Sequence, residues 1–368
     1  MDEQKKMAQI PESVANVVAD GDAILVLSGF SGSPETPIGL RVSTHALSLA
    51  SPAFKNTFAT ATPPTNADGG AAQPTIVNLL DEDADAIYIL VNILHLRNDK
   101  LPAHLPPSGL RRLAILAQKY ACVVAAGRAT VHWFDRLYFN TSTTTNSAEI
   151  WSMIEAAYLF DEATFFARFT TSWIFKQSLH TKQIPLATTA ETQKLALMLA
   201  ERQSQAQILL RRDIDMLADS CAFTFSKDKV HYIDYAPGLS PDPDEGRQAV
   251  TCPVDSEGAK EYLGALRDAK IWPSLVWGDY KPRSSNSALQ DLTISDVVER
   301  VKAFREPEYD DCDKCEFCED VRLTFIETLQ SKREEQEKRL WGLCLDCFKA
   351  GMAKGSGECR VEHAKGAL

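Results

Sequence analysis

The fold of this chain is decided by residues 40–58, LRVSTHALSLASPAFKNTF. The apolar start of this segment, Leu40 to Val42, predicts a strand. Ser43 is a good helix N-cap, because its hydroxyl can accept a hydrogen bond from a free backbone N–H of the first turn. Pro52 disfavours helix at the residue before it, so a first short helix ends there and a second one runs to Phe58. The segment therefore predicts a strand followed by two short helices.

Apolar runs of strand length lie on both sides of this segment. Ile24 to Leu27 is followed by turn residues, and we expect it to pair with Leu40 to Val42. Ile76 to Leu80 predicts another strand, after which Asp81 or Asp83 can cap a helix. Two apolar stripes at helical spacing follow: Ile87, Leu90, Val91 and Leu94, then Leu110, Leu113, Ala114, Ala117, Ala121 and Val124. Short strands interleaved with helices favour an α+β fold.

This order of elements, from roughly Asp20 to Leu137, resembles the BTB/POZ domain. The chain is similar to the BTB proteins of filamentous fungi at three places: Ser48–Lys55, Asn92–His95 and Ala117–Tyr120. The resemblance implies a BTB fold, in which short strands combine with helical hairpins. It also implies a module that assembles with proteins, as a homodimer or with another partner, and that has no known catalysis.

One departure from the family concerns the dimer. The commoner family pattern has His-Lys where this chain has Ser43 and Thr44, and His45 lies one place beyond. In many BTB dimers that basic group lies near the aspartate matched here by Asp22. The charged pair that the resemblance would place at a dimer pocket is therefore incomplete in this chain.

Composition divides the whole chain into five parts. Residues 1–19 carry Ile10, Val14 and Val17 at helical spacing, which predicts a short amphipathic helix. We then expect a BTB/POZ domain at 20–140 and a helical extension at 147–220, similar in position to BACK-type helices. A loop-rich helical region at 221–305 and a small cysteine-rich C-terminal module at 306–368 follow. Within the loop-rich region, Thr293 and Asp296 resemble a capping box.

Charge and hydropathy narrow the classes of function. The formal net charge of −11 opposes a broad hold on phosphates, so we expect no nucleic-acid partner. The N-terminus lacks the apolar core of a secretory signal, and the chain has no apolar run of about 18 residues that could cross a membrane. We therefore expect an intracellular protein, in the cytoplasm, the nucleus or both. Glycine-rich phosphate-binding motifs are also absent, and we expect no enzyme.

The cysteines gather at the C-terminal end. Six of the nine lie from Cys312 onward, too unevenly for a disulfide framework of the whole chain. Their spacing is Cys312-x2-Cys315-x2-Cys318, Cys344-x2-Cys347 and Cys359-x3-His363. Two C-x2-C pairs can supply four thiolates to one structural zinc ion. The simplest such set is Cys312, Cys315, Cys344 and Cys347.

Other uses of these thiols stay open. A second site from the other ligands would need one more donor, such as Cys252, Cys221 or water, beside Cys318, Cys359 and His363. Alternatively, the reduced thiols pack as small apolar groups and bind no metal. A catalytic zinc would need an open coordination position and a nearby general base, and the sequence around these ligands offers no such base.

The predicted function is a protein-interaction scaffold, acting by homotypic or heterotypic assembly. Its candidate interaction residues are Ile10, Val14, Val17, Asp22, Phe54, Phe58 and Tyr88. The first alternative is a substrate adaptor of a cullin-3 ubiquitin ligase, which would dock between Phe54 and the helix near Tyr88. For Phe54 and Phe58, packing in the core is the competing role. The second alternative, a zinc-dependent DNA-binding transcriptional regulator, is opposed by the acidic charge.

Overall fold

The computed structural model describes residues 11–31, 36–61, 73–140, 146–176, 189–226, 230–234, 247–251, 263–269, 271, 293–303, 342–351, 359–361 and 363. The chain forms two compact units. The first comprises Met1–Trp173 with Gly342–Gly366 and Leu368, and the second comprises Ile174–Trp341 with Ala367. The described part of the predicted cysteine-rich module therefore belongs to the same unit as the predicted BTB segment.

The first unit contains a four-stranded sheet in the order β1-β3-β2-β4. Its strands are β1 (Ser13–Asn16), β2 (Ala23–Leu27), β3 (Ile38–Val42) and β4 (Thr75–Leu79). β2 pairs antiparallel with β3 and parallel with β4, whereas β1 pairs parallel with β3. All five residues of β2 are buried, as expected of an apolar run at the centre of a sheet. The predicted pairing is confirmed, with Leu25 opposite Leu40.

The predicted N-terminal helix is wrong where the structure describes it, because β1 replaces it. The Val17 N–H donates to the carbonyl of Arg41 at 3.0 Å, which continues the contact with β3. Gly39 permits this approach, since a Cβ there would lie 3.0 Å from Val14 Cγ2. Valines fit a helical stripe by spacing, but their branched side chains favour a strand when an open sheet edge is at hand. Ile10 lies outside the described residues.

The two short helices are α1 (Thr44–Ala50) and α2 (Pro52–Thr60). Ser43 caps α1, as predicted, by accepting a hydrogen bond from the Ala46 N–H at 3.4 Å. Ser51 ends α1 and caps α2 by accepting from the Phe54 N–H at 3.0 Å. The Ser51 hydroxyl also donates to the carbonyl of Tyr120, so this turn is tied to the end of a later helix.

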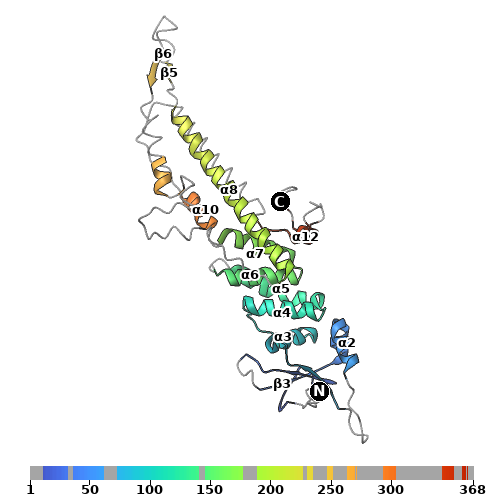
Figure 1. Cartoon of the computed structure of the whole chain (residues 1–368). Coiled ribbons are helices and arrows are strands. Elements are labelled where there is room, and N and C mark those ends of the chain that lie inside the picture. Colours follow the sequence, from blue (N-terminus) through green and yellow to red (C-terminus); the bar gives the residue numbers. More distant parts are fainter. Residues whose placement is uncertain are drawn as a thin grey trace, which may run out of the picture. The chain divides into compact units, whose positions relative to one another are not determined.

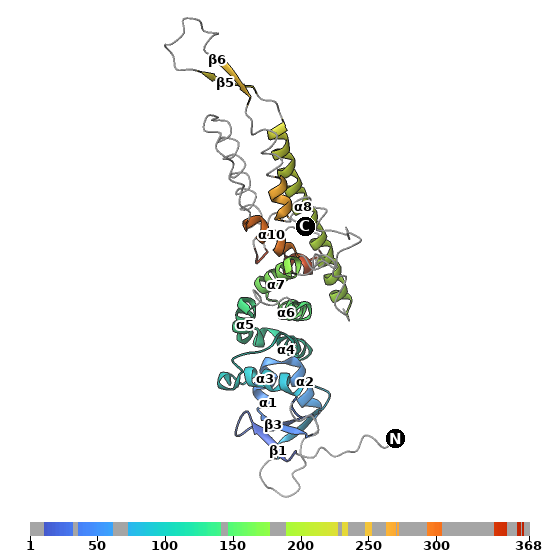
Figure 2. The same cartoon turned by 90° about the vertical axis from the view of Figure 1, so that its left-hand side faces the viewer.

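Five further helices follow: α3 (Ala84–Leu94), α4 (Pro107–Lys119), α5 (Val123–Asn140), α6 (Ser147–Leu159) and α7 (Ala163–Lys176), with a 3-10 turn at Asn98–Lys100. α3 lies between the sheet and α4, and α4 packs against α5 and α6 (Figures 1 and 2). Asp83 caps α3, and the predicted stripe of that helix is buried. The second stripe is buried only as far as Ala117, because α4 ends at Lys119 and leaves Ala121 and Val124 exposed.

Three helices of this unit end in the same way. Each is followed by a residue other than glycine in the left-handed conformation: Leu96 at φ 59°, Ala121 at φ 51° and Asp161 at φ 60°. After α6, the Glu162 N–H returns to the carbonyl of Ala157 at 2.9 Å, which is the closing bond of a Schellman motif. Aspartate tolerates this conformation better than most residues. The backbone therefore fixes the place of Asp161 between α6 and α7.

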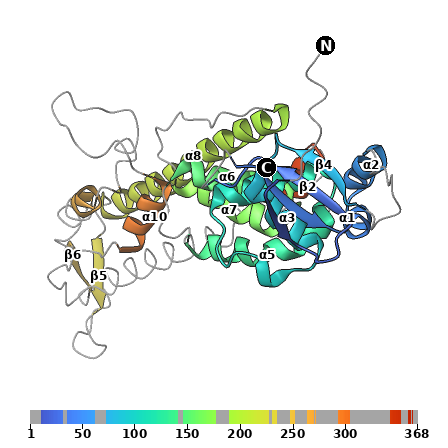
Figure 3. The same cartoon turned by 90° about the horizontal axis from the view of Figure 1, so that it is seen from below.

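The second unit contains α8 (Ala190–Ser226), the antiparallel pair β5 (Val230–Asp234) and β6 (Arg247–Thr251), and α10 (Ile294–Ala303) (Figure 3). The predicted capping box opens α10. The Asp296 N–H donates to Thr293 Oγ1 at 3.1 Å, and the Thr293 N–H donates to Asp296 Oδ2 at 2.8 Å. No helix within the described ranges is both long enough and apolar enough to cross a membrane.

Candidate metal centre

Three thiols and one imidazole converge near the end of the chain. The donor atoms of Cys344, Cys347, Cys359 and His363 all lie within 4.8 Å of one another. Cys347 Sγ is 3.6 Å from Cys359 Sγ and 3.5 Å from His363 Nε2. Cys344 and Cys347 are buried, whereas Cys359 and His363 are half-buried. The group is therefore a compact set of soft ligands with one side near solvent.

The spacing of these donors fits tetrahedral zinc. With Zn–S bonds of about 2.3 Å and a Zn–N bond of about 2.0 Å, two sulfurs are about 3.8 Å apart, and a sulfur and a nitrogen are about 3.6 Å apart. Two of the measured separations already match these edges. The other separations are at most 4.8 Å and so exceed these edges by at most about 1 Å, a shift that side-chain rotation can supply. The donor set can therefore enclose one divalent ion.

The local fold brings the first two ligands together. α12 (Leu345–Lys349) begins immediately after Cys344, which occupies its N-cap position. Cys347 lies three residues further, within the first turn, so both thiols are presented at the start of the same helix. The donor atoms of Cys359 and His363, which come later in the chain, lie beside this turn. The ligands thus come in two sequence pairs that must be held together.

The thiol of Cys347 is held in its protonated form by its surroundings. Burial, followed by hydrogen bonds with the thiols of Cys359 and Cys344, raises the pKa of Cys347 to about 12. At neutral pH this thiol keeps its proton until a metal ion displaces it. Metal binding at this site would therefore release protons and strengthen as the pH rises.

The segment that carries α12 is docked onto α7. The Leu343 N–H donates to Thr170 Oγ1 at 2.9 Å, and Thr170 in turn donates to the carbonyl of Phe166 at 2.7 Å. Gly342 is required for this approach, because a Cβ there would lie 2.7 Å from Thr170 Oγ1 and closer still to the carbonyl of Ala167. The backbone at Gly342 and Leu343 therefore lies in direct contact with α7.

Aromatic packing completes the docking. Phe348 of α12 is buried, and its ring lies 5.7 Å from that of Tyr158 in α6 and 6.1 Å from that of Phe166 in α7. The first pair meets edge to face, a favourable arrangement for aromatic rings. The Lys349 ammonium lies 5.4 Å from the centre of the Tyr158 ring. α12 is thus seated on both helices of the α6–α7 hairpin.

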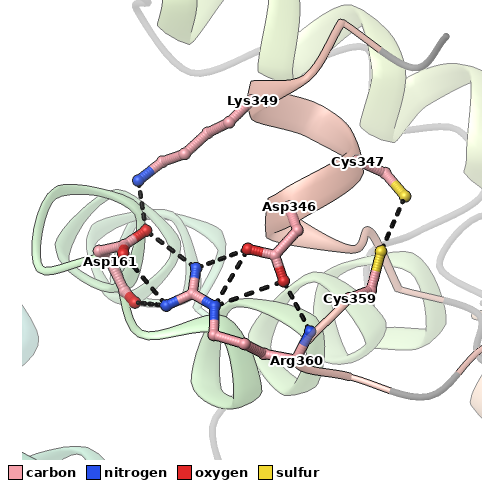
Figure 4. A network of polar contacts seen from close by, with 6 residues as sticks. All are labelled: Asp161, Asp346, Cys347, Lys349, Cys359 and Arg360. Atoms are coloured by element: carbon pink, nitrogen blue, oxygen red, sulfur yellow. Dashed lines mark hydrogen bonds and ion pairs between the residues drawn. The ribbon is translucent and has the colours of Figure 1, made fainter. Parts of the chain in front are cut away.

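A network of charged groups adjoins the cluster (Figure 4). Arg360 binds Asp346 of α12 and also Asp161 of the α6–α7 turn. Lys349 makes a second ion pair with Asp161. The hydrogen bond from Arg360 lowers the pKa of Asp346. Burial acts to raise the pKa of Asp161, but the bonds from Arg360 and Lys349 outweigh it and lower that pKa as well. Both carboxylates are therefore charged partners of the network at neutral pH.

The grouping of the ligands differs from the simplest predicted set. Cys344 and Cys347 lie with Cys359 and His363, two residues that we had assigned to a second site. Cys312, Cys315 and Cys318 lie outside the described residues. One sequence signal favours the observed grouping: 12 positions separate Cys347 from Cys359, fewer than separate Cys318 from Cys344, and shorter loops close at lower entropic cost.

No spacing in the sequence predicts the charged network of Asp161, Asp346, Lys349 and Arg360. Asp161 and Arg360 are 199 positions apart, so neither spacing nor periodicity relates them. Thr170 and Leu343 are likewise 173 positions apart. The one available signal was that Asp346 and Arg360 are each adjacent in sequence to a candidate ligand cysteine.

The aromatic interaction candidates are partly core. Phe54 is fully buried, and its ring stacks on Tyr120 at 4.2 Å and on Phe58 at 6.1 Å. Phe58 and Tyr88 are half-buried, and Tyr88 meets the ring of Phe30 edge to face at 5.6 Å. Phe54 therefore stabilises the fold and cannot serve as a docking side chain.

The remaining candidates are also bound within the chain. Asp22 is exposed, but it accepts a hydrogen bond from the Thr44 N–H at 2.7 Å and another from the Thr44 hydroxyl. Burial acts to raise the pKa of Asp22, and the bonds from Thr44 outweigh it and lower the pKa. Val17 is buried and Val14 is half-buried against the sheet. Thr44 thus satisfies the carboxylate for which the family pattern suggested a basic partner.

Comparison with known proteins adds no relative. Neither protein-family models, nor curated proteins, nor solved structures yield a match to this chain.

Proposed function

We propose that this protein is a non-enzymatic interaction scaffold whose BTB-like N-terminal segment self-associates through α1. The observation that supports this most directly is the exposure of Leu49, which presents 76% of its surface to solvent. Leu47 is the one fully buried residue of α1. His45 lies one turn before Leu49 and is also exposed, so both lie on the outer face of the helix. This face is the surface that we assign to assembly.

The chemistry of this face favours a symmetric apolar contact. Burying one leucine side chain is worth about 1.5–3 kcal/mol, and a two-fold interface counts each such residue twice. Asp22 already has Thr44 as its hydrogen-bond donor, so a charged pair across the interface is not needed to satisfy it. The proposed dimer therefore depends on Leu49 in place of the basic residue of the family.

The C-terminal ligand set holds a structural zinc ion in this proposal. Cys344, Cys347, Cys359 and His363 would fill all four positions of a tetrahedral site. A closed site of this kind leaves no position for water or substrate, which suits a structural role. Zinc would stabilise the docked C-terminal segment by binding the folded state alone.

The self-association is tested by light scattering on the full chain after size exclusion. We expect a dimer mass for the wild type and a monomer mass for Leu49→Asp, because the change removes apolar burial and places two carboxylates near each other. Leu96→Asp is the matched control: Leu96 is 82% exposed, lies in the turn after α3 and should leave the dimer intact. A wild-type monomer at the highest soluble concentration, or a dimer that survives Leu49→Asp, would refute the proposed surface.

No observation favours a second function. Phe54, which marks one side of the predicted cullin-3 docking face, is a core residue. The net charge of −11 opposes a DNA-binding regulator.

A further inference from the structure

The charged network is connected directly to the ligands of the candidate metal centre. Asp346 immediately precedes Cys347, and Arg360 immediately follows Cys359. The two sequence pairs of ligands are therefore each adjacent to one member of the Asp346–Arg360 contact. One ligand of each pair, Cys347 or Cys359, is thus a single peptide unit away from this contact, so the position of the contact restricts where these two ligands can lie.

Arg360 bridges these residues through both backbone and side chain. Its N–H donates to Asp346 Oδ2 at 2.8 Å, and its Nε and Nη2 donate to Oδ1 at 3.0 and 2.7 Å. The contact is thus made at three donors, one of which belongs to the main chain beside Cys359. Arg360 therefore sets the distance between the Cys344–Cys347 turn and the Cys359–His363 return.

The same guanidinium reaches a second element. Nη1 donates to the carbonyl oxygen of Asp161 at 2.8 Å and to Oδ2 at 3.1 Å, and Nη2 donates to Oδ1 at 3.0 Å. Asp161 occupies the left-handed position that ends α6, and hydrogen bonds of the helix end fix its backbone. Arg360 is therefore held by a rigid point of the hairpin while it positions two pairs of ligands.

We infer that Arg360 is a positioning residue that couples metal binding to the docking of residues 342–351 and 359–361 on the α6–α7 hairpin. This inference rests on the proposed zinc site and adds that zinc binding controls the docking of the segment. Because the ligands and the docking contacts share one bridge, metal binding favours the docked segment and docking favours metal binding to the same degree. Loss of the metal would release α12 and uncover Tyr158 and Phe166, against which Phe348 packs.

A simpler view treats the network as ordinary surface ion pairs. The side chains of Arg360 and Asp161 are 46% and 47% exposed, and exposed pairs contribute little on their own. The two views differ in which property of the Arg360 side chain is required. A surface pair needs a positive charge, which lysine also supplies, whereas bridging two carboxylates needs the planar fork of arginine.

Arg360→Lys separates these views. Zinc affinity is measured by competition with a chromophoric chelator. Zinc that the wild type binds and Cys359→Ser does not bind is counted as bound at this site. We expect Arg360→Lys to bind zinc about 10 to 100 times more weakly, the range found when partners of metal ligands are changed. Arg112→Lys is the control, because Arg112 forms a partly exposed ion pair with Asp83, far along the chain from the ligands, and this variant should bind zinc as the wild type does.

Hydrogen exchange supplies a readout that metal affinity alone does not. In the wild type, zinc should slow exchange both in residues 342–351 and in the α6–α7 hairpin, and a chelator should reverse this in both. In Asp161→Ala, which changes no ligand and no neighbour of one, saturating zinc should no longer protect the hairpin. The coupling is overturned if Arg360→Lys binds zinc as tightly as the wild type, or if zinc still protects the hairpin in Asp161→Ala.

Failure of the zinc site and failure of the coupling give different results. If the wild type holds no zinc that Cys359→Ser removes, the proposed zinc site is wrong and the coupling falls with it. If the wild type holds this zinc and Arg360→Lys holds it equally tightly, the site stands and only the role of Arg360 is refuted.

Discussion

The core around β2 and the docked segment around α12 are both buried, yet they are held in different ways. In the first, the buried residues of β2 and α1–α4 come from one stretch of about 100 residues, and apolar side chains dominate. In the second, the segment joins α7 across 173 positions and adds a thiol and imidazole cluster and a four-residue charged network. Contacts so distant in sequence carry a larger entropic cost of closure. The comparison teaches that the distant segment needs specific anchors where the local core needs only packing.

The largest expected effect is on the local core. Phe54→Ala should lower the free energy of unfolding of the first unit by about 3–5 kcal/mol, because it removes a fully buried ring between Tyr120 and Phe58. Urea unfolding followed by circular dichroism measures this. Phe58→Ala, at a half-buried position, should cost clearly less. Equal losses at both positions would contradict the assignment of Phe54 to the core.

Metal removal should affect the other region alone. After chelation, Cys344, Cys347 and Cys359 should react rapidly with a thiol reagent, because the proposed release of α12 exposes them and ends the burial that raises the pKa of Cys347. Cys122 should stay unreactive, because it is buried in the local core and burial raises its pKa to about 11. Peptide mapping by mass spectrometry identifies the labelled sites. Rapid labelling of Cys122 on chelation would show that the two regions are not independent.

His95 makes a pH-sensitive contact in the local core. His95 accepts a hydrogen bond from the Ser43 N–H at 3.1 Å through Nε2, and its Nδ1 lies 2.8 Å from the carbonyl of Val91. A neutral ring satisfies both contacts, with Nδ1 as the donor. Burial lowers the pKa of His95 below its ordinary value of 6.5.

The sign of the pH effect follows from this shift. The stabilisation is complete above pH 6.5 and falls as the pH drops toward the lowered pKa of the folded state, because the unfolded state then binds more protons. Each pKa unit of depression is worth about 1.4 kcal/mol. His95→Gln should remove this part of the pH dependence in urea titrations, whereas His132→Gln, at an exposed position, should keep it. A pH dependence unchanged by His95→Gln would contradict the role of this contact.

The smallest effect concerns a helix end. Ala121→Gly should raise the free energy of unfolding by about 0.5–1 kcal/mol, because glycine takes the left-handed conformation at no steric cost. Ala125→Gly, an exposed position within α5, should lower it by about 1 kcal/mol. Thermal unfolding of both variants provides the measurement. A loss of stability in both would show that the backbone at Ala121 is not strained.

The elements of the local core could be predicted from the sequence because their signals are local. Caps such as Ser43 and Asp83, the break at Pro52 and the apolar run of β2 act over a few residues, and each is confirmed. The N-terminal helix was wrong because an open sheet edge, a tertiary feature, determined the conformation of residues 13–16.

The candidate site was predicted only in its chemistry. The spacing Cys344-x2-Cys347 indicated metal ligands, and the structure brings these two residues to Cys359 and His363. Which pairs combine depends on where residues 342–351 dock. That position is set by Gly342, Thr170 and the Asp161–Arg360 contact, and such distant contacts leave no periodic trace in a single sequence.

The most direct test of the ligand set is X-ray absorption at the zinc edge, on a variant in which Cys312, Cys315 and Cys318 are all replaced by serine. The account predicts one zinc ion per chain with three sulfur neighbours at about 2.3 Å and one nitrogen neighbour at about 2.0 Å, and loss of the nitrogen on further change of His363→Ala. A variant that holds no zinc while the wild type shows four sulfur neighbours would contradict it, because the ion would then need the earlier cysteines.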